Sequence, residues 1–233
     1  MTRYKAVYPR HTWEIVQENM EAFEKDMKEI CDTASKKGAS LARLIEASKI
    51  AVDERVTLKC TIPPCEMYGK CHMCPPFSPT AEETKKVVSK YERAILLEVA
   101  MTLPKEYWDI IQREGVPLWK WRQEPAYTEW EHKTQYPLWI KLHDIVMEVE
   151  RQAHNRGYFF AIGYVASTCY LCWDPANPFG GCDTKSSCKY PYAARPSVEA
   201  SGMDIFSTYR NVGLKLKMAS PEKLSWIGLV LIV

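Results

Sequence analysis

Apolar residues follow a helical spacing in two long segments of the chain. Between Trp13 and about Lys37 they recur at alternating gaps of four and three residues, and a second stripe of this kind follows Pro137. This spacing predicts two amphipathic helices, each with one face turned toward a core. Pro137 suits the first turn of the second helix, and Gly157 suits the C-terminal cap.

Shorter patterns predict a sheet and two further helices. Thr80 can cap the free amide of Glu83, whose carboxylate can reach back, so a helix is expected from there to about Tyr91. A short helix is expected near 204–211, and residues 41–58 are mixed in character. The strand-like runs are Ala94–Val99, Tyr158–Val165, Leu214–Met218 and Trp226–Ile232. Long alternation of strands and helices is missing, which predicts an α+β fold with an antiparallel or mixed sheet, packed helices and two Cys-rich loops.

Residues 104–136 differ from the rest in their aromatic content. Their aromatic residues and prolines are Trp108, Trp119, Trp121, Trp130, Tyr107, Tyr127, Tyr136, Pro104, Pro117 and Pro125. Such a segment can form a lid or pocket wall, or it can pack on the core or contact another protein. No convergent polar residues are visible in it, which favours packing or contact. We therefore expect one domain over residues 1–233 with an aromatic-rich insertion at about 104–136.

Composition and charge exclude several classes of protein. Hydrophobic residues make up 46% of the chain and aromatic residues 12%, which is too high for a disordered protein. Lys and Arg number 31 against 29 Asp and Glu, and this balance gives no support for binding to nucleic acid or to an anionic membrane. The first residues lack the apolar region of a secretory signal, and the longest apolar run, Ile227–Val233, is too short to cross a bilayer. We expect a cytoplasmic protein.

Cysteine is the unusual component, because eight of the nine cysteines fall in two tight groups. Thiols stay reduced in the cytoplasm, so clustered cysteines there indicate metal rather than disulfides. Each group has four thiols, which is the number that saturates a cubane iron–sulfur cluster or a tetrahedral zinc. The candidate ligands are Cys60, Cys65, Cys71 and Cys74 in the first group and Cys169, Cys172, Cys182 and Cys188 in the second.

The spacing within the groups favours iron–sulfur clusters over zinc. Each group has only one pair separated by two residues, and its other cysteines lie at loose, unequal distances along the chain. Paired short knuckles are the usual zinc signature, although Cys71 and Cys74 could combine with the first pair of the second group in a zinc site. His72 could bind iron, face solvent or donate a hydrogen bond to a cluster sulfur. The ninth cysteine, Cys31, lies on the first helical stripe and is expected to be a buried thiol.

Two stretches of sequence carry a resemblance to a known family. The first is Cys65 with Tyr68-Gly69 and Cys74-Pro75-Pro76, and the second is Cys182, Cys188 and Pro191 followed by Arg195–Asp204. From about Arg55 to the C-terminus the chain resembles domain-of-unknown-function family 2284, predicted metal-binding proteins that occur largely in anaerobic bacteria and archaea. The resemblance implies metal, in the form of iron–sulfur, and no substrate. Arg195 could place a cation near a cluster, or its segment could pack the second cysteine loop onto the helix after Gly202.

Electron transfer is the function that these residues favour. Eight cysteines would complete two [4Fe-4S] clusters, which suits one-electron transfer or a redox accessory role for a larger anaerobic enzyme. An enzyme or cofactor-assembly factor with an open iron, or a structural zinc interaction module, are the alternatives. No phosphate loop or nucleophile elbow is present. We expect a redox partner protein and no nucleic-acid or membrane partner, and homo-oligomer formation stays open.

Overall fold

The computed structural model describes residues 4–7, 14–17, 19–102, 105, 109, 125–172, 181–217, 219–220 and 223–233. The helical elements are α1 Met20–Lys36, the short 3₁₀ turn η1 Ala47–Lys49, α2 Glu54–Thr61, α3 Ala81–Val88, α6 Pro125–Trp130, the π-helical turn η2 Glu131–Gln135, α7 Tyr136–Asn155 and α8 Ile205–Asn211. The strands are β1 Tyr4–Val7, β2 Glu14–Gln17, β3 Leu41–Glu46, β4 Ala51–Val52, β5 Arg93–Met101, β6 Ile162–Tyr164, β7 Met203–Asp204, β8 Ala219–Ser220 and β9 Lys223–Leu231.

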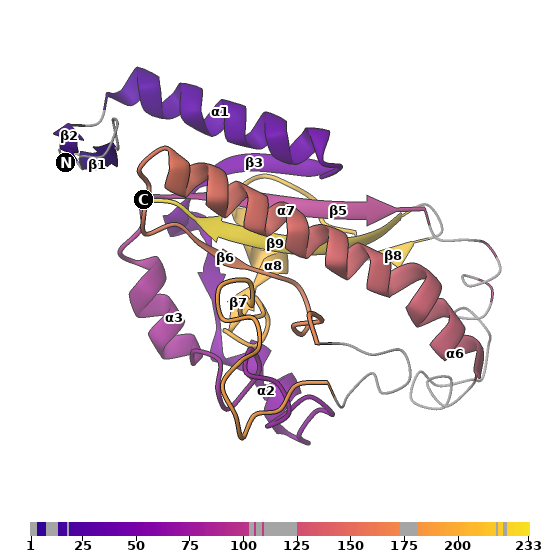
Figure 1. Cartoon of the computed structure of the whole chain (residues 1–233). Coiled ribbons are helices and arrows are strands. Elements are labelled where there is room, and N and C mark those ends of the chain that lie inside the picture. Colours follow the sequence, from indigo (N-terminus) through magenta and orange to yellow (C-terminus); the bar gives the residue numbers. More distant parts are fainter. Residues whose placement is uncertain are drawn as a thin grey trace.

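The main sheet is antiparallel and confirms the α+β fold. Its strands lie in the order β3-β5-β9-β6, and β8 pairs with β9. Two small sheets, β1 with β2 and β4 with β7, accompany it. Helices α1 and α7 cover one face of the main sheet, while α3 and α8 lie on the other side (Figure 1).

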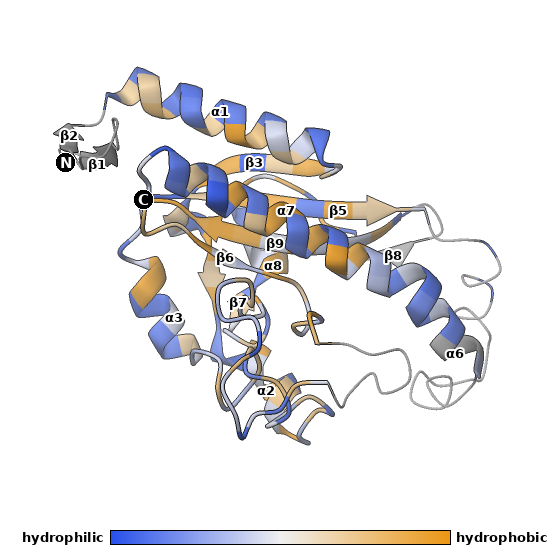
Figure 2. Cartoon of the chain, viewed as in Figure 1, coloured by the Kyte–Doolittle hydropathy of each residue, from blue (hydrophilic) through white to orange (hydrophobic). Residues whose placement is uncertain are grey.

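Alternation along the central strands creates two hydrophobic cores. On β5, Ile95 and Leu97 belong to the core beneath α1 and α7, whereas Ala94 and Leu96 face the second core. Figure 2 shows these strands as mostly hydrophobic and both covering helices as striped with hydrophilic residues. Successive side chains of a strand point to opposite faces of the sheet, so a strand that is covered on both faces needs apolar residues at every position.

Helix α7 lies unusually close to the sheet, because two glycines face it. A Cβ at Gly163 would meet Val146 Cγ1 at 2.3 Å, and a Cβ at Gly228 would meet Val146 Cγ2 at 2.8 Å. Both distances are shorter than side chains tolerate. The glycines therefore set the depth at which α7 packs, and α7 in turn holds one of the cysteine loops.

Several predicted elements differ from the structure at their ends. The first helix begins at Met20 rather than Trp13, because residues 14–17 pair as strand β2. The capping box at Thr80 is confirmed, and Gly157 has the positive φ of 92° that suits its place after α7. The strand predicted over 214–218 is wrong for 214–217, which form no regular element. The short strand here is β8.

Most of the aromatic-rich segment lies outside the described residues, including Trp108, Trp119 and Trp121. Its last part forms α6 and η2, and Trp130 is buried in the core beneath α1 and α7. Among the helices that the structure describes, none combines the length and apolar character needed to cross a membrane.

Candidate metal centre

The two cysteine groups meet at one end of the molecule, although about a hundred residues separate them in the sequence. Cys60 is in α2 and the rest of the first group follows in the loop to α3. The second group follows β6. In Figure 1 the two loops lie side by side at the bottom of the view. The sequence predicted each group but could not show that they meet.

Hydrogen bonds fasten the two loops to each other. His72 Nε2 lies 3.1 Å from the carbonyl oxygen of Asp183 and 2.9 Å from that of Ser186. Because carbonyl oxygens only accept, the Nε2–H form of the ring is the one that bridges them. Thr184 Oγ1 donates to the Gly69 carbonyl oxygen at 3.0 Å. The ring of His72 thus serves the contact between the loops.

The second group surrounds one small cavity together with a member of the first group. The cysteines that line this cavity are Cys71, Cys169, Cys172, Cys182 and Cys188. Four of them come from the second group, which is the number that a cubane cluster or a tetrahedral zinc takes from a protein. The donor set therefore fits a thiolate-bound metal, and Cys71 lies at the boundary between the groups.

Backbone amides point at several of these sulfurs. Met73 N donates to Cys71 Sγ at 3.4 Å, and Tyr190 N donates to Cys188 Sγ at the same distance. Burial is the main cause that raises the pKa of Cys169 to about 12, and an amide hydrogen bond from Leu171 opposes it. Amide donors stabilise a thiolate and tune a metal bound to it, so these amides partly offset the cost that burial imposes on a charged sulfur.

Cys71 and Cys74 share a proton in the part of the array that joins the groups. The thiol of Cys74 donates to Cys71, which lowers the pKa of Cys71 well below its usual value and raises that of Cys74. The Cys74 sulfur also lies 3.1 Å from Thr168 Oγ1, on the segment that leads to the second group. Both cysteines are buried. The two thiols therefore lie in contact where the groups join.

The remaining first-group thiols continue the array toward α2. The pKa of Cys60 is raised to about 11, first by burial and then by the neighbouring Cys65 and Glu199. Cys65 also acts on Cys74 through its charge. The sulfurs therefore form a continuous series from Cys60 through Cys65, Cys74 and Cys71 to the second group. Among the described residues, no three Cys, His, Asp or Glu side chains converge as a site for a single metal ion.

Helix α7 anchors the second cysteine loop. The buried carboxylate of Glu150 accepts from Arg195 Nε at 2.7 Å and from the Gly163 amide at 2.8 Å, and Arg195 Nη2 completes the pair. His143 Nε2 donates to the Ala193 carbonyl oxygen at 2.7 Å. The charge of Arg195 is thus matched by Glu150, and the pair fastens this segment to α7, whereas packing onto the helix after Gly202 was expected.

Aromatic stacking holds the start of the same loop. Tyr170, next to Cys169, stacks on Trp139 of α7 with ring centroids 3.9 Å apart and planes within 2°. Tyr136, the last residue of the aromatic-rich segment, meets Tyr170 edge-on at 6.4 Å. These contacts fix the backbone from which the Cys169 sulfur projects.

A pocket opens beside Cys60, between α2 and α8. It has a volume of about 370 Å³, and it is lined by Asp53, Arg55, Val56, Lys59, Cys60, Glu199, Met203, Asp204, Ile205, Phe206 and Ile227. Sequence reasoning missed α2 and this pocket, because α2 is only eight residues long and buries no residue. The available signal was Asp53, an N-cap residue type directly before a run of helix formers.

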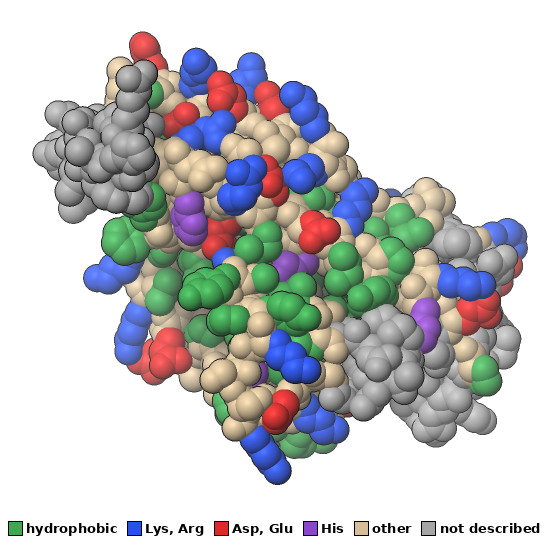
Figure 3. Space-filling view, in the orientation of Figure 1, with side chains coloured by type: hydrophobic (Ala, Val, Ile, Leu, Met, Phe, Trp, Pro, Cys, Tyr) green, Lys and Arg blue, Asp and Glu red, His purple; other side chains and the backbone are tan. Residues whose placement is uncertain are grey.

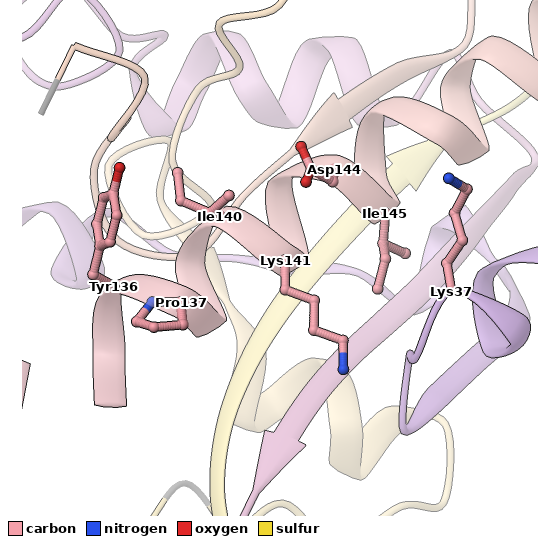
Figure 4. A pocket seen from close by; sticks show the side chains of 7 residues that line it. All are labelled: Lys37, Tyr136, Pro137, Ile140, Lys141, Asp144 and Ile145. Atoms are coloured by element: carbon pink, nitrogen blue, oxygen red, sulfur yellow. The ribbon is translucent and has the colours of Figure 1, made fainter. Parts of the chain in front are cut away.

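Two other candidate positions lie apart from the thiol array. A groove between the end of α1 and α7, shown in Figure 4, has Lys37, Lys141 and Asp144 among its lining residues and no cysteine. Cys31 is partly buried against the core beneath α1 and α7, and burial is the main cause that raises its pKa to about 11. This placement agrees with the structural role expected for Cys31.

Comparison with protein families gives one match. Residues 43–232 match the family described as predicted metal-binding protein (DUF2284). The match begins somewhat before the point from which the sequence motifs suggested a resemblance, and it includes all eight clustered cysteines. Searches of the curated proteins and of the solved structures found no match.

Proposed function

The chain belongs to this family of predicted metal-binding proteins, and on that premise we propose that its eight clustered cysteines hold two adjacent [4Fe-4S] clusters for electron transfer. Bound clusters would supply one-electron redox chemistry. The observation that carries the proposal is the continuous thiol series, in which Cys71 of the first group lines the cavity of the second group.

Each cysteine has a role in this proposal. The second group, on its own loop, holds one cluster, and the first group holds the other. Cys71 and Cys74 connect the two sites, since they lie in contact and Cys71 lines the second cavity. Electrons pass between redox centres more readily when the centres are close, so this connection suits a relay.

An open-iron cluster and a structural zinc are the alternatives. An open iron would leave Cys60 as the free thiol of the series, because Cys60 faces the pocket between α2 and α8. A zinc that combines the two short pairs is consistent with Cys71 lying beside Cys169 and Cys172. Metal and sulfide analysis separates all three forms.

The partner that we propose is a redox protein that docks near the second group, in the cytoplasm of an anaerobic cell. Tyr190 is 46% exposed and Tyr192 is 90% exposed, and they lie two and four residues after Cys188 in the chain. In the space-filling view, hydrophobic side chains gather below α7, over the loops of this region (Figure 3). Exposed aromatic residues are enriched where proteins meet.

The test is the iron, acid-labile sulfide and zinc content of protein purified without oxygen. We expect about eight irons and eight sulfides per chain, the content of two cubanes. About four irons would support one cluster with an open position. Zinc without sulfide would overturn the redox proposal.

Single substitutions test the assignment of ligands. Cys71→Ser and Cys60→Ser should each leave about four irons, because each variant removes one ligand of the first cluster. Cys31→Ser is the matched control and should leave the iron content unchanged. Iron loss in Cys31→Ser would show that the ligand assignment is wrong.

A further inference from the structure

Thr168 belongs to one cysteine loop and contacts the other through its side chain. It stands directly before Cys169 of the second group, yet its Oγ1 lies 3.1 Å from the Sγ of Cys74 in the first group. Both residues are buried, with 7% of Thr168 and 5% of Cys74 exposed. Water therefore competes little for this hydrogen bond, and a buried hydroxyl without a partner would be costly.

The Thr168 hydroxyl acts as a donor toward sulfur. Cys71 and burial are the main causes that raise the pKa of Cys74, and the hydroxyl opposes them. The same hydroxyl adds to the hydrogen bond from Cys74 that lowers the pKa of Cys71. Both effects favour a charged sulfur. A metal-bound cysteine is a thiolate, which only accepts hydrogen bonds, so the hydroxyl must be the donor when a metal is bound.

The turn before Thr168 has contacts of its own. Ser167 has a positive φ of 64°, which is uncommon for a residue other than glycine. Its amide donates to Glu199 Oε2 at 3.0 Å, and Ser197 Oγ donates to the same oxygen at 2.8 Å. These bonds hold the left-handed conformation from which the chain continues to Thr168. The backbone that carries the hydroxyl is therefore fixed from outside the two cysteine groups.

We propose that Thr168 is a positioning residue that raises the reduction potential of the cluster held by the first group, by donating a hydrogen bond to Cys74. The inference rests on the proposed function and adds a residue that controls one of its two sites from the loop of the other. The hydroxyl stabilises the Cys74 sulfur more strongly when an added electron makes that sulfur more negative, so it favours the reduced form. The hydrogen stays on the Thr168 oxygen, and only an electron is gained.

The test is a redox titration of the unsubstituted chain and of Thr168→Val, prepared without oxygen and followed by EPR. Valine keeps the branched shape and removes the hydroxyl. We expect the potential of one cluster to become more negative by on the order of a tenfold change in the reduction equilibrium, or ~59 mV for one electron. The potential of the other cluster should stay unchanged. Thr168→Ser keeps the hydroxyl and should retain the potential of the unsubstituted chain.

Two controls separate this hydroxyl from its surroundings. Ser167→Ala removes the neighbouring hydroxyl, which lies 3.1 Å from the hydroxyl of Tyr170, and it should leave both potentials unchanged. In a Cys60→Ser background only the second cluster is expected, so adding Thr168→Val there should have no effect on the potential. A shift in that background equal to the shift in the full chain would overturn the assignment of Thr168 to the first group.

Iron and sulfide analysis of the same samples distinguishes failure of this inference from failure of the proposed function. About eight irons in Thr168→Val with unchanged potentials would overturn the role of Thr168 and leave two clusters in place. Zinc without sulfide in the unsubstituted chain would overturn both proposals.

A second pair of variants keeps the inference testable if Thr168→Val loses iron. Thr168→Ala and Thr168→Ser both shorten the side chain and differ from each other by one oxygen. A more negative potential in Thr168→Ala alone would support the inference, and equal potentials in the two variants would contradict it.

Discussion

The sheet beneath α1 and α7 and the loops that carry the cysteines are stabilised in different ways. The sheet side buries large side chains completely, among them Phe23, Ile95 and Leu97. The loop side has little of this packing: α2 buries no residue, and between residues 60 and 78 the buried residues are Cys71, Cys74 and Ser78. Apolar burial therefore accounts for the sheet, while the loops rely on hydrogen bonds and, in our proposal, on metal.

Metal removal should have the largest effect, and it should destabilise the cysteine loops while leaving the sheet side intact. The amides of Met73 and Tyr190 donate to cysteine sulfurs, and removal of the metal should make them exchange hydrogen rapidly. The reason is that metal binding supplies folding free energy on the order of 10 kcal/mol in small metal sites. Amides of β5 and β9 should stay protected. Equal loss of protection in both regions would contradict the comparison.

Glu150→Gln should cause the next largest loss of stability. Glu150 lies where helix α7 of the sheet side contacts the second cysteine loop. It leaves the buried Arg195 guanidinium without its carboxylate, and breaking such a pair costs about 3–5 kcal/mol. Glu148→Gln on the same helix breaks the more exposed pair with Arg151 and should cost less than about 1 kcal/mol. Urea unfolding of both variants measures the difference, and equal costs would remove Glu150 as the anchor.

The sequence predicted best where a pattern is local. The helix after Pro137 and the capping box at Thr80 are confirmed, because the signals lie within one element. Helix α2 was missed because it buries nothing. The strand predicted over 214–218 was wrong for 214–217, because Leu214 and Leu216 pack against the second core without pairing as a strand. The meeting of the cysteine groups depends on contacts such as that of His72 with Ser186, 114 residues apart, which no local pattern encodes.

Overpacking at Gly228 should have a smaller effect. It should lower the stability of the sheet side without changing the metal content of the loops. Gly228→Ala places a methyl group 2.8 Å from Val146 Cγ2, and overpacking of this kind costs about 1–3 kcal/mol. Gly213→Ala is the comparison, since nothing lies within 4 Å of its added Cβ and only its φ of 73° is unfavourable. Thermal unfolding should show a greater loss for Gly228→Ala and unchanged iron content in both variants.

The smallest effect is a pH dependence from His143. Burial is the main cause that lowers its pKa, and Arg195 lowers it further, while Asp144, Glu150 and the bond to Ala193 oppose this. Because the folded pKa lies below the unfolded value, the unfolded state takes up the proton first, and stability falls as pH drops through about 6.5. The free energy of unfolding of His143→Gln should fall less than that of the unsubstituted chain between about pH 7 and about pH 5.5. Identical slopes would exclude His143 as the titrating group.

The most direct test of two adjacent clusters is the EPR spectrum of anaerobically purified protein after reduction with dithionite. We predict split signals, because two reduced clusters connected through Cys71 and Cys74 would lie close enough for their spins to interact. A spectrum of a single isolated cluster, or no signal from a chain that holds zinc, would contradict the account.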